Sequence, residues 1–182
     1  AVPNIAIEDE IMRINGYSIF FGETKIAFLG AEQISPLGFF VSPHGKGRYY
    51  ADAGGRTVTI EAQMTQKTVH VEESADGQLS VAASFTFDMT VSDIGSAGLS
   101  QQETETVKAG VAQQIAQSAE SLLALSKNYG CDFLGLYKIY QTKHRAKFYS
   151  IDWPDKIRNM QYSVDVQAGT FENNLTNEEL WR

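Results

Sequence analysis

The clearest pattern in this chain is an alternation of apolar and polar residues over positions 79–92. A period of two is typical of a β-strand, because successive side chains of a strand point to opposite faces of the sheet. One face here is apolar and the other is polar, so we expect an antiparallel sheet that is covered on one side only. The apolar face carries Leu79, Val81, Ala83, Phe85, Phe87, Met89 and Val91.

Shorter versions of the same pattern predict the other strands. Two segments rich in Ile and Phe flank Gly22-Glu23-Thr24, which is typical of a hairpin with a short loop. The run Ser74-Ala75-Asp76-Gly77 predicts a second hairpin turn, because Asp-Gly readily takes the positive φ angles of such turns. We therefore expect one antiparallel sheet of about five to six strands. The predicted strands are 12–21, 25–30, 48–51, 57–71, 79–92 and 161–168.

A change of period from two to about 3.6 predicts one long helix at about 101–129. Ser100 and Glu103 have the spacing of a capping box, which satisfies backbone amides at a helix start. Gly130 predicts the end of this helix, because glycine readily takes the left-handed conformation found there. The apolar stripe of the helix consists of Val107, Val111, Ile115, Ala119, Leu122, Leu123, Leu125 and Tyr129.

We expect this stripe to pack on the apolar face of the sheet. Ser35-Pro36 predicts the start of a shorter helix, since proline suits the first helical turn. The predicted fold class is therefore α+β, with one long helix on one face of an antiparallel sheet and shorter helices besides.

The composition is that of one globular domain. The chain has 182 residues, of which 43% are hydrophobic and 20% are charged, and it shows no internal repeat or linker. We expect a core over 12–169 and a polar tail over 170–182, where Thr176 and Glu179 have the spacing of another helix cap. The formal net charge of -7 argues against a nucleic-acid partner, because phosphates would be repelled.

Signals for membranes and targeting are weak. No uninterrupted apolar run reaches the roughly 20 residues that a membrane-spanning helix needs. The chain begins with Ala-Val-Pro-Asn, without an initiator Met or a signal peptide, so we expect a fragment of a longer protein.

The sequence contains no recognisable catalytic or metal-binding motif. Cys131 is the single cysteine, which excludes an internal disulfide and a thiolate-rich metal site. The glycine-rich loop 44–48 lacks the Ser or Thr that follows Lys in a phosphate-binding loop, so we interpret it as a surface loop. Glu72-Glu73 is interpreted as a solvated pair of carboxylates. We therefore expect no cofactor, no bound metal and no enzymatic activity; the histidines, without metal-ligand spacing, are His44, His70 and His144.

One segment, 137–158, combines basic and aromatic side chains. It can be interpreted as a contact surface for an anionic membrane or an acidic partner. It can also be interpreted as amphipathic structure, in which aromatic rings pack inward and the lysine chains extend to solvent. The candidate contact residues are Lys138, Lys143, Arg145, Lys147 and Trp153. The first interpretation predicts that Lys143, Arg145 and Lys147 form an exposed, locally positive face.

Several short motifs occur in an order that resembles the C-terminal domain of the Ger(x)C family, the C subunits of bacterial spore germinant receptors. The resemblance covers about 12–169. Three features depart from the family pattern: Tyr137 replaces an acidic residue, no Pro precedes the basic stretch, and the basic ending beyond Gly169 is missing. The motifs are Ile14 to Phe20, Lys25 to Leu29, Asp132-Phe133-Leu134-Gly135-Leu136, Lys143-His144-Arg145, Trp153 and Tyr162-Ser163-Val164-Asp165-Val166.

The resemblance implies a domain without catalysis. The full-length protein would be a lipoprotein on the outer face of the spore inner membrane, acting with integral-membrane A and B type subunits in sensing germinants. Its signal peptide, lipidated cysteine and two preceding domains would be absent from this chain. The residues also permit an alternative, a small-ligand-binding α+β domain of an extracytoplasmic protein, with Phe85 and Phe87 partly open in a pocket. A third hypothesis, an enzyme, would need a cleft with a strained or pKa-shifted residue.

Overall fold

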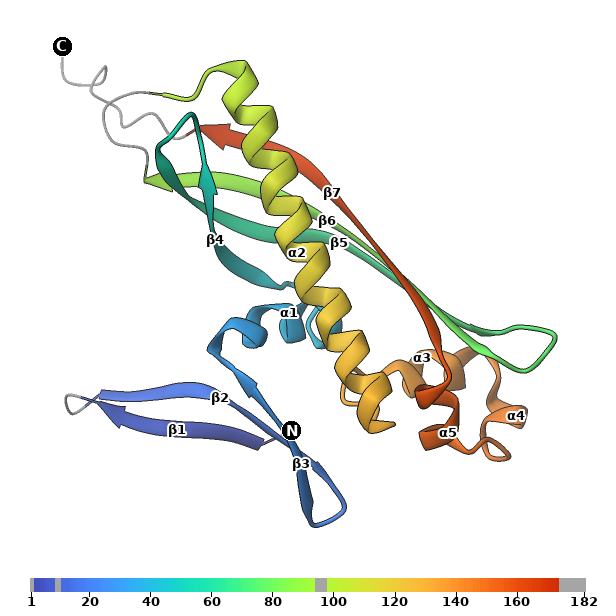
Figure 1. The fold of residues 1–182 in the computed structure, drawn as a ribbon. Coiled ribbons are helices and arrows are strands. Elements are labelled where there is room, and N and C mark those ends of the chain that lie inside the picture. Colours follow the sequence, from blue (N-terminus) through green and yellow to red (C-terminus); the bar gives the residue numbers. More distant parts are fainter. Residues whose placement is uncertain (1, 9–10, 94–97, 174–182) are drawn as a thin grey trace.

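The structure is a computed structural model that describes residues 2–8, 11–93 and 98–173. It has two β-sheets, one long helix and shorter helices, as the sequence predicts for an α+β fold (Figure 1). The small sheet consists of β1 (Val2–Glu8), β2 (Ile11–Phe21) and β3 (Thr24–Gly30). The large sheet consists of β4 (Lys46–Asp52), β5 (Thr57–Glu73), β6 (Leu79–Asp93) and β7 (Gln161–Asn173). The helices are α1 (Ala31–Val41), α2 (Gln101–Tyr129), α3 (Leu136–Lys143), α4 (Arg145–Phe148) and α5 (Trp153–Arg158).

The core lies between the large sheet and helix α2, which runs along one face of that sheet (Figure 1). The alternating apolar residues of β6 are all buried, as predicted. Phe85 and Phe87 belong to the same buried cluster as Val111 and Ile115 of α2, which confirms that the long helix covers the sheet. Helix α1 covers part of the same face, with the Phe39 ring 4.8 Å from the Phe87 ring in an edge-on contact.

Two features of the sheets differ from the prediction. The predicted single sheet is wrong, because the N-terminal hairpin pairs with β1 in a separate three-stranded sheet. The expectation of purely antiparallel pairing is also wrong, because β7 runs parallel to β6. Alternation of side chains is the same in parallel and antiparallel strands, so it carries no information on strand direction. The long connection through α2 and α3–α5 is the crossover that a parallel pair requires.

Strand β5 contains a bulge that changes which of its residues face the core. Its buried residues fall on even positions up to Met64 and on an odd position at Val71. The pairing of β5 with β6 shifts by one residue between Met64 and Gln66, so Thr65 forms a bulge. A bulge adds one residue to one strand and thereby changes which positions face the core.

Helix α1 links the two sheets. It covers all of 31–41, so Pro36 lies inside the helix and not at its predicted start. Its last turn is held by Lys67 of β5, whose Nζ donates to the carbonyl oxygens of Phe40 at 2.9 Å and Ser42 at 2.8 Å. A cation that donates to the last carbonyls of a helix also complements the helix dipole.

Helix α2 begins and ends as predicted. The Ser100 amide donates to Glu103 Oε2 at 2.8 Å, and Gly130 ends the helix with φ of 58°. One expectation is wrong, because Tyr129 is exposed instead of belonging to the buried stripe. The predicted tail also begins later than expected, since β7 continues to Asn173, and the predicted cap at Thr176 lies outside the described residues. Within the described part of the chain, no helix combines the length and apolar character needed to cross a bilayer.

Candidate functional site

The family-like motif 132–136 forms a tight turn that leads into α3. The Asp132 carboxylate accepts hydrogen bonds from four successive backbone amides. The donors are Leu134 at 3.2 Å, Gly135 at 2.8 Å, Leu136 at 3.0 Å and Tyr137 at 2.7 Å. Because a carboxylate at a helix start satisfies free amides and complements the helix dipole, this motif is structural.

The other residues of the motif have structural roles too. Gly135 has φ of 82°, a left-handed conformation that side chains other than Asn and Asp seldom take. Leu134 and Leu136 are buried in the core. Burial raises the pKa of Asp132, and the four donated hydrogen bonds oppose that rise.

A second carboxylate joins the helical end of the molecule to the large sheet. Glu73, at the end of β5, has a side chain that is only 8% exposed. It pairs with Lys147 of α4 at 2.5 Å and with Lys156 of α5 at 2.8 Å, and the Tyr140 hydroxyl donates to it at 3.1 Å. The hydrogen bonds from Lys147 and then Lys156 lower the pKa of Glu73 to about 2 against the opposing effect of burial. The interpretation of Glu73 as a solvated carboxylate is therefore wrong.

Glu72 and Glu73 neutralise part of the positive charge on the face predicted for α3 and α4. Lys143, Arg145 and Lys147 are exposed, as expected. Lys143, however, pairs with Glu72 at 3.4 Å, and Lys147 pairs with Glu73. The expectation of a locally positive face is therefore wrong for these two lysines. The hairpin of β5 and β6 brings the acids there, and the sequence separation of about 70 residues hid that contact.

The aromatic residues of this segment pack together. Trp153 lies against Tyr140 with ring centroids 5.4 Å apart and against Phe148 at 5.6 Å. The Trp153 indole N–H is buried without a hydrogen-bond partner. The Lys138 ammonium group lies 5.9 Å from the Tyr137 ring centroid. This arrangement agrees with the alternative interpretation for Tyr140, Phe148 and Trp153, whose rings pack together while basic chains extend outward. Tyr149, in contrast, is exposed.

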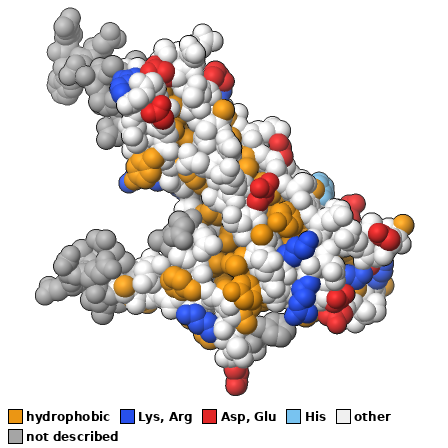
Figure 2. All heavy atoms as spheres, in the orientation of Figure 1, with side chains coloured by type: hydrophobic (Ala, Val, Ile, Leu, Met, Phe, Trp, Pro, Cys, Tyr) orange, Lys and Arg blue, Asp and Glu red, His pale blue; other side chains and the backbone are white. Residues whose placement is uncertain are grey.

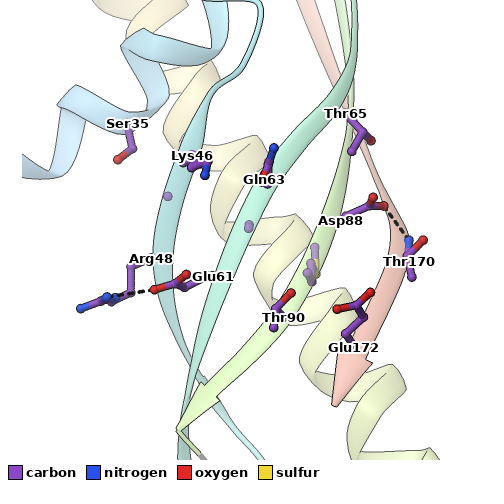
Figure 3. A pocket seen from close by; sticks show the side chains of 13 residues that line it. Ser35, Lys46, Arg48, Glu61, Gln63, Thr65, Asp88, Thr90, Thr170 and Glu172 are labelled. Atoms are coloured by element: carbon purple, nitrogen blue, oxygen red, sulfur yellow. Dashed lines mark hydrogen bonds and ion pairs between the residues drawn. The ribbon is translucent and has the colours of Figure 1, made fainter. Parts of the chain in front are cut away.

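A polar trough lies on the face of the large sheet that points away from α2 (Figure 3). Its volume is about 660 Å³, and its side chains come from the outward positions of all four strands and from Ser35 of α1. Lys46 and Arg48 supply cations on β4, while Asp88 and Glu172 supply carboxylates on β6 and β7. The sequence did not predict this trough, although its polar positions are the outward half of the strand alternation.

Three charged side chains of the trough, Arg48, Glu61 and Asp88, already have partners in the protein. Arg48 pairs with Glu61 at 2.9 Å, and Asp88 accepts the Thr170 amide at 2.8 Å where the pairing of β6 and β7 shifts. Asp88 thus stabilises a β-bulge. The trough offers charges of both signs to solvent, whereas small-molecule sites are lined predominantly by apolar and aromatic side chains.

The ligand pocket expected around the aromatic residues of β6 is not formed. Phe85 and Phe87 have no exposed surface and contact other aromatic rings within the core. Burial raises the pKa of the Cys131 thiol, so it stays protonated at neutral pH. Among the described residues, no group of three or more His, Cys, Asp or Glu could hold a metal ion.

The fold of this chain resembles that of a solved protein structure. The fold matches a solved structure described as that of the GerBC protein, with a TM-score of 0.73, 12% sequence identity and 94% of this chain covered. This chain spans 55% of the length of that one. No curated protein sequence matches the chain.

The family model described as "Spore germination B3/GerAC like, C-terminal" matches residues 15–169. The chain belongs to this family, which confirms the resemblance seen in the sequence.

Proposed function

We propose that this chain is a non-catalytic domain of a spore germination lipoprotein, and that the full-length protein acts in a membrane-associated germinant receptor complex. The observation that carries the proposal is the family match over 15–169, together with the shared fold. In the proposed complex the partners are integral-membrane A and B type subunits. A lipid anchor outside this chain would hold the protein on the outer face of the spore inner membrane.

Two carboxylates with shifted pKa values, Asp132 and Glu73, have structural roles, which supports a function without catalysis. Asp132 caps a helix with four amides, and Glu73 joins two helices to a strand. A catalytic acid or base must be able to reach a substrate proton with its side chain. The carboxylates of Asp132 and Glu73 are instead bound to backbone amides and to lysines of the protein itself.

The contact surface in this proposal is the exposed end formed by α3 and α4. Lys143 and Lys147 are held by acids of β5, and Trp153 lies in the aromatic cluster. We therefore assign the contact to Lys138 and Arg145, whose side chains are exposed and make no ion pair within the described part of the chain. Cations at the rim of an interface steer association more than they add affinity.

The receptor role can be tested in the bacterium that carries the gene. Deletion of the codons for this domain should leave spore formation intact and abolish the loss of refractility that a germinant mixture triggers. Decoated spores treated with lysozyme serve as the control, because opening the cortex enzymatically bypasses a receptor. A deletion strain that germinates normally with every nutrient mixture tested would refute the proposal.

The contact surface needs a separate test. The full-length protein, tagged and solubilised from spore membranes, should co-purify with two integral-membrane proteins. Arg145→Glu should reduce their recovery about threefold or more, because reversal of a rim charge slows association. Arg48→Glu is the matched control, since Arg48 is an exposed arginine on a different face. Equal recovery with both variants would exclude α4 as the contact.

A further inference from the structure

The small sheet carries large apolar side chains on both of its faces. Its inner face, with Ile19, Ala27 and Leu29, is buried and packs with α1. Paired residues of neighbouring strands point to the same face, and Val2 pairs with Ser18, which pairs with Phe28. These positions, with Asn4, Gly16, Phe20 and Lys25, the partner of Phe20, form what we call the outer face of the small sheet.

Large apolar side chains on the outer face are open to solvent. Val2 is 54% exposed, Phe20 is 41% exposed and Phe28 is 48% exposed. Figure 2 shows hydrophobic side chains gathered over the part of the molecule that the small sheet forms. The outer face of the large sheet shows the opposite pattern, since its outward positions are polar.

Polar groups of the outer face contact neighbours within the sheet, and the Lys25 ammonium group lies 5.4 Å from the Phe28 ring centroid. Asn4 Nδ2 donates to Ser18 Oγ at 2.9 Å, and Ser18 is buried. The Phe28 ring lies over Gly16, because a Cβ atom at Gly16 would lie 2.5 Å from that ring. The face thus has a glycine recess under an aromatic ring.

An antiparallel sheet with a solvated face normally alternates apolar and polar side chains. Contiguous exposed apolar surface on a soluble domain marks a contact site. The remaining question is which surface covers Val2, Phe20 and Phe28.

The location of this face within the family identifies its partner. The matching family model describes a C-terminal region, and this chain covers 55% of the GerBC chain, so that protein has further structure outside the matched part. Val2 is the first described residue and lies on the outer face, so a chain that enters β1 arrives beside Phe28. We propose that the outer face of the small sheet docks against the domain that precedes this one in the full-length protein. The proposal goes beyond the receptor role and holds whether or not the protein acts in a receptor.

The test uses the full-length protein with Phe28→Glu. A buried carboxylate at the domain contact should separate the two domains, because an unpaired charge is strongly disfavoured there. Proteolysis at the junction upstream of β1 should become about tenfold faster, in proportion to the separated population. The radius of gyration from small-angle scattering should rise. Val2→Glu should act in the same way, and it keeps the test valid if Phe28→Glu impairs folding.

Tyr149→Glu is the matched control, since Tyr149 is an aromatic residue that is 76% exposed and lies outside the small sheet. It should leave the proteolysis rate unchanged. Three results would each overturn the proposal. The first is a wild-type proteolysis rate for both outer-face variants. The second is Phe28-dependent dimerisation of the full-length protein without a change at the junction. The third is Phe28-dependent binding to phosphatidylglycerol vesicles, again without a change at the junction.

Discussion

At the scale of single residues, two carboxylates show two ways of stabilising a charge inside this fold. Asp132 is surrounded by backbone amides, whereas Glu73 is surrounded by two lysines and a tyrosine. The amides are fixed by the turn and need no additional ordering. The lysines belong to different helices, so Glu73 depends on the packing of α4 and α5 against the sheet.

We expect Asp132→Ala to lower the free energy of unfolding by about 2 kcal/mol, because it removes a helix cap and leaves several amides without an acceptor. Asp132→Asn should cost less, since its oxygen can still accept from the amides that Oδ1 binds. Urea unfolding followed by circular dichroism measures both changes. Asp165→Ala, at an exposed aspartate of β7, is the control and should leave the free energy of unfolding nearly unchanged. An equal loss of stability in both variants would contradict the capping role of Asp132.

Glu73 predicts a specific dependence of stability on pH. Its pKa in the folded protein is about 2, below the ordinary value of 4.5, so the folded state binds this proton less readily than the unfolded state does. The contribution of Glu73 is therefore complete above about pH 4.5 and is lost as the pH falls toward 2. The urea midpoint should decrease over this window, and Glu73→Gln should weaken the decrease. Glu72→Gln, at a neighbouring exposed carboxylate, should leave the pH profile as it is.

At the scale of the elements, α2 is the helix that covers the buried face of the large sheet. It covers the sheet with one face and carries Gly110 near its middle, where glycine has no conformational role in a regular helix. Apart from its chain neighbours and the adjacent backbone of the helix, a Cβ atom added at Gly110 would have no heavy atom within 4 Å.

Gly110→Ala should therefore raise the free energy of unfolding by about 1 kcal/mol, through the lower entropy of the unfolded chain. Thermal unfolding measures the change. Gly16→Ala is the contrasting substitution, because its Cβ would lie 2.3 Å from the Leu29 carbonyl oxygen, and it should destabilise the protein. A decrease in stability with Gly110→Ala would contradict the structural account of α2.

The elements differ in how much of them could be predicted. The alternation on β6 and the caps of α2 predicted both elements, because local patterns encode side-chain direction and helix ends. The partners of each strand could not be predicted in this way. Nothing local separates the hairpin of β2 and β3 from the large sheet, and nothing local shows that Glu72 and Glu73 meet Lys143 and Lys147. The trough and the outer face of the small sheet depend on register, which emerges only when the strands pair.

At the scale of the whole molecule, the two sheets present opposite surfaces. The large sheet turns a polar trough to solvent, while the small sheet turns Val2, Phe20 and Phe28 outward. Helix α1 lies between the two sheets. Phe39 and Phe40 contact aromatic rings of β6, and Lys67 of β5 binds the end of the helix. The same helix also contacts β2 and β3 of the small sheet. One domain thus offers separate surfaces for separate contacts.

The parallel pairing of β7 with β6 also constrains the order in which the protein can assemble during its synthesis. Ser84 and Asp165 are hydrogen-bonded neighbours at 3.3 Å but lie 81 residues apart along the chain. Closing so long a loop is slow, whereas β4, β5 and β6 pair through short connections. On the ribosome, the antiparallel strands can therefore associate while β7 is still being translated. Until β7 emerges, the edge of β6 stays unpaired, so we expect the nascent chain to be most prone to aggregation in that interval.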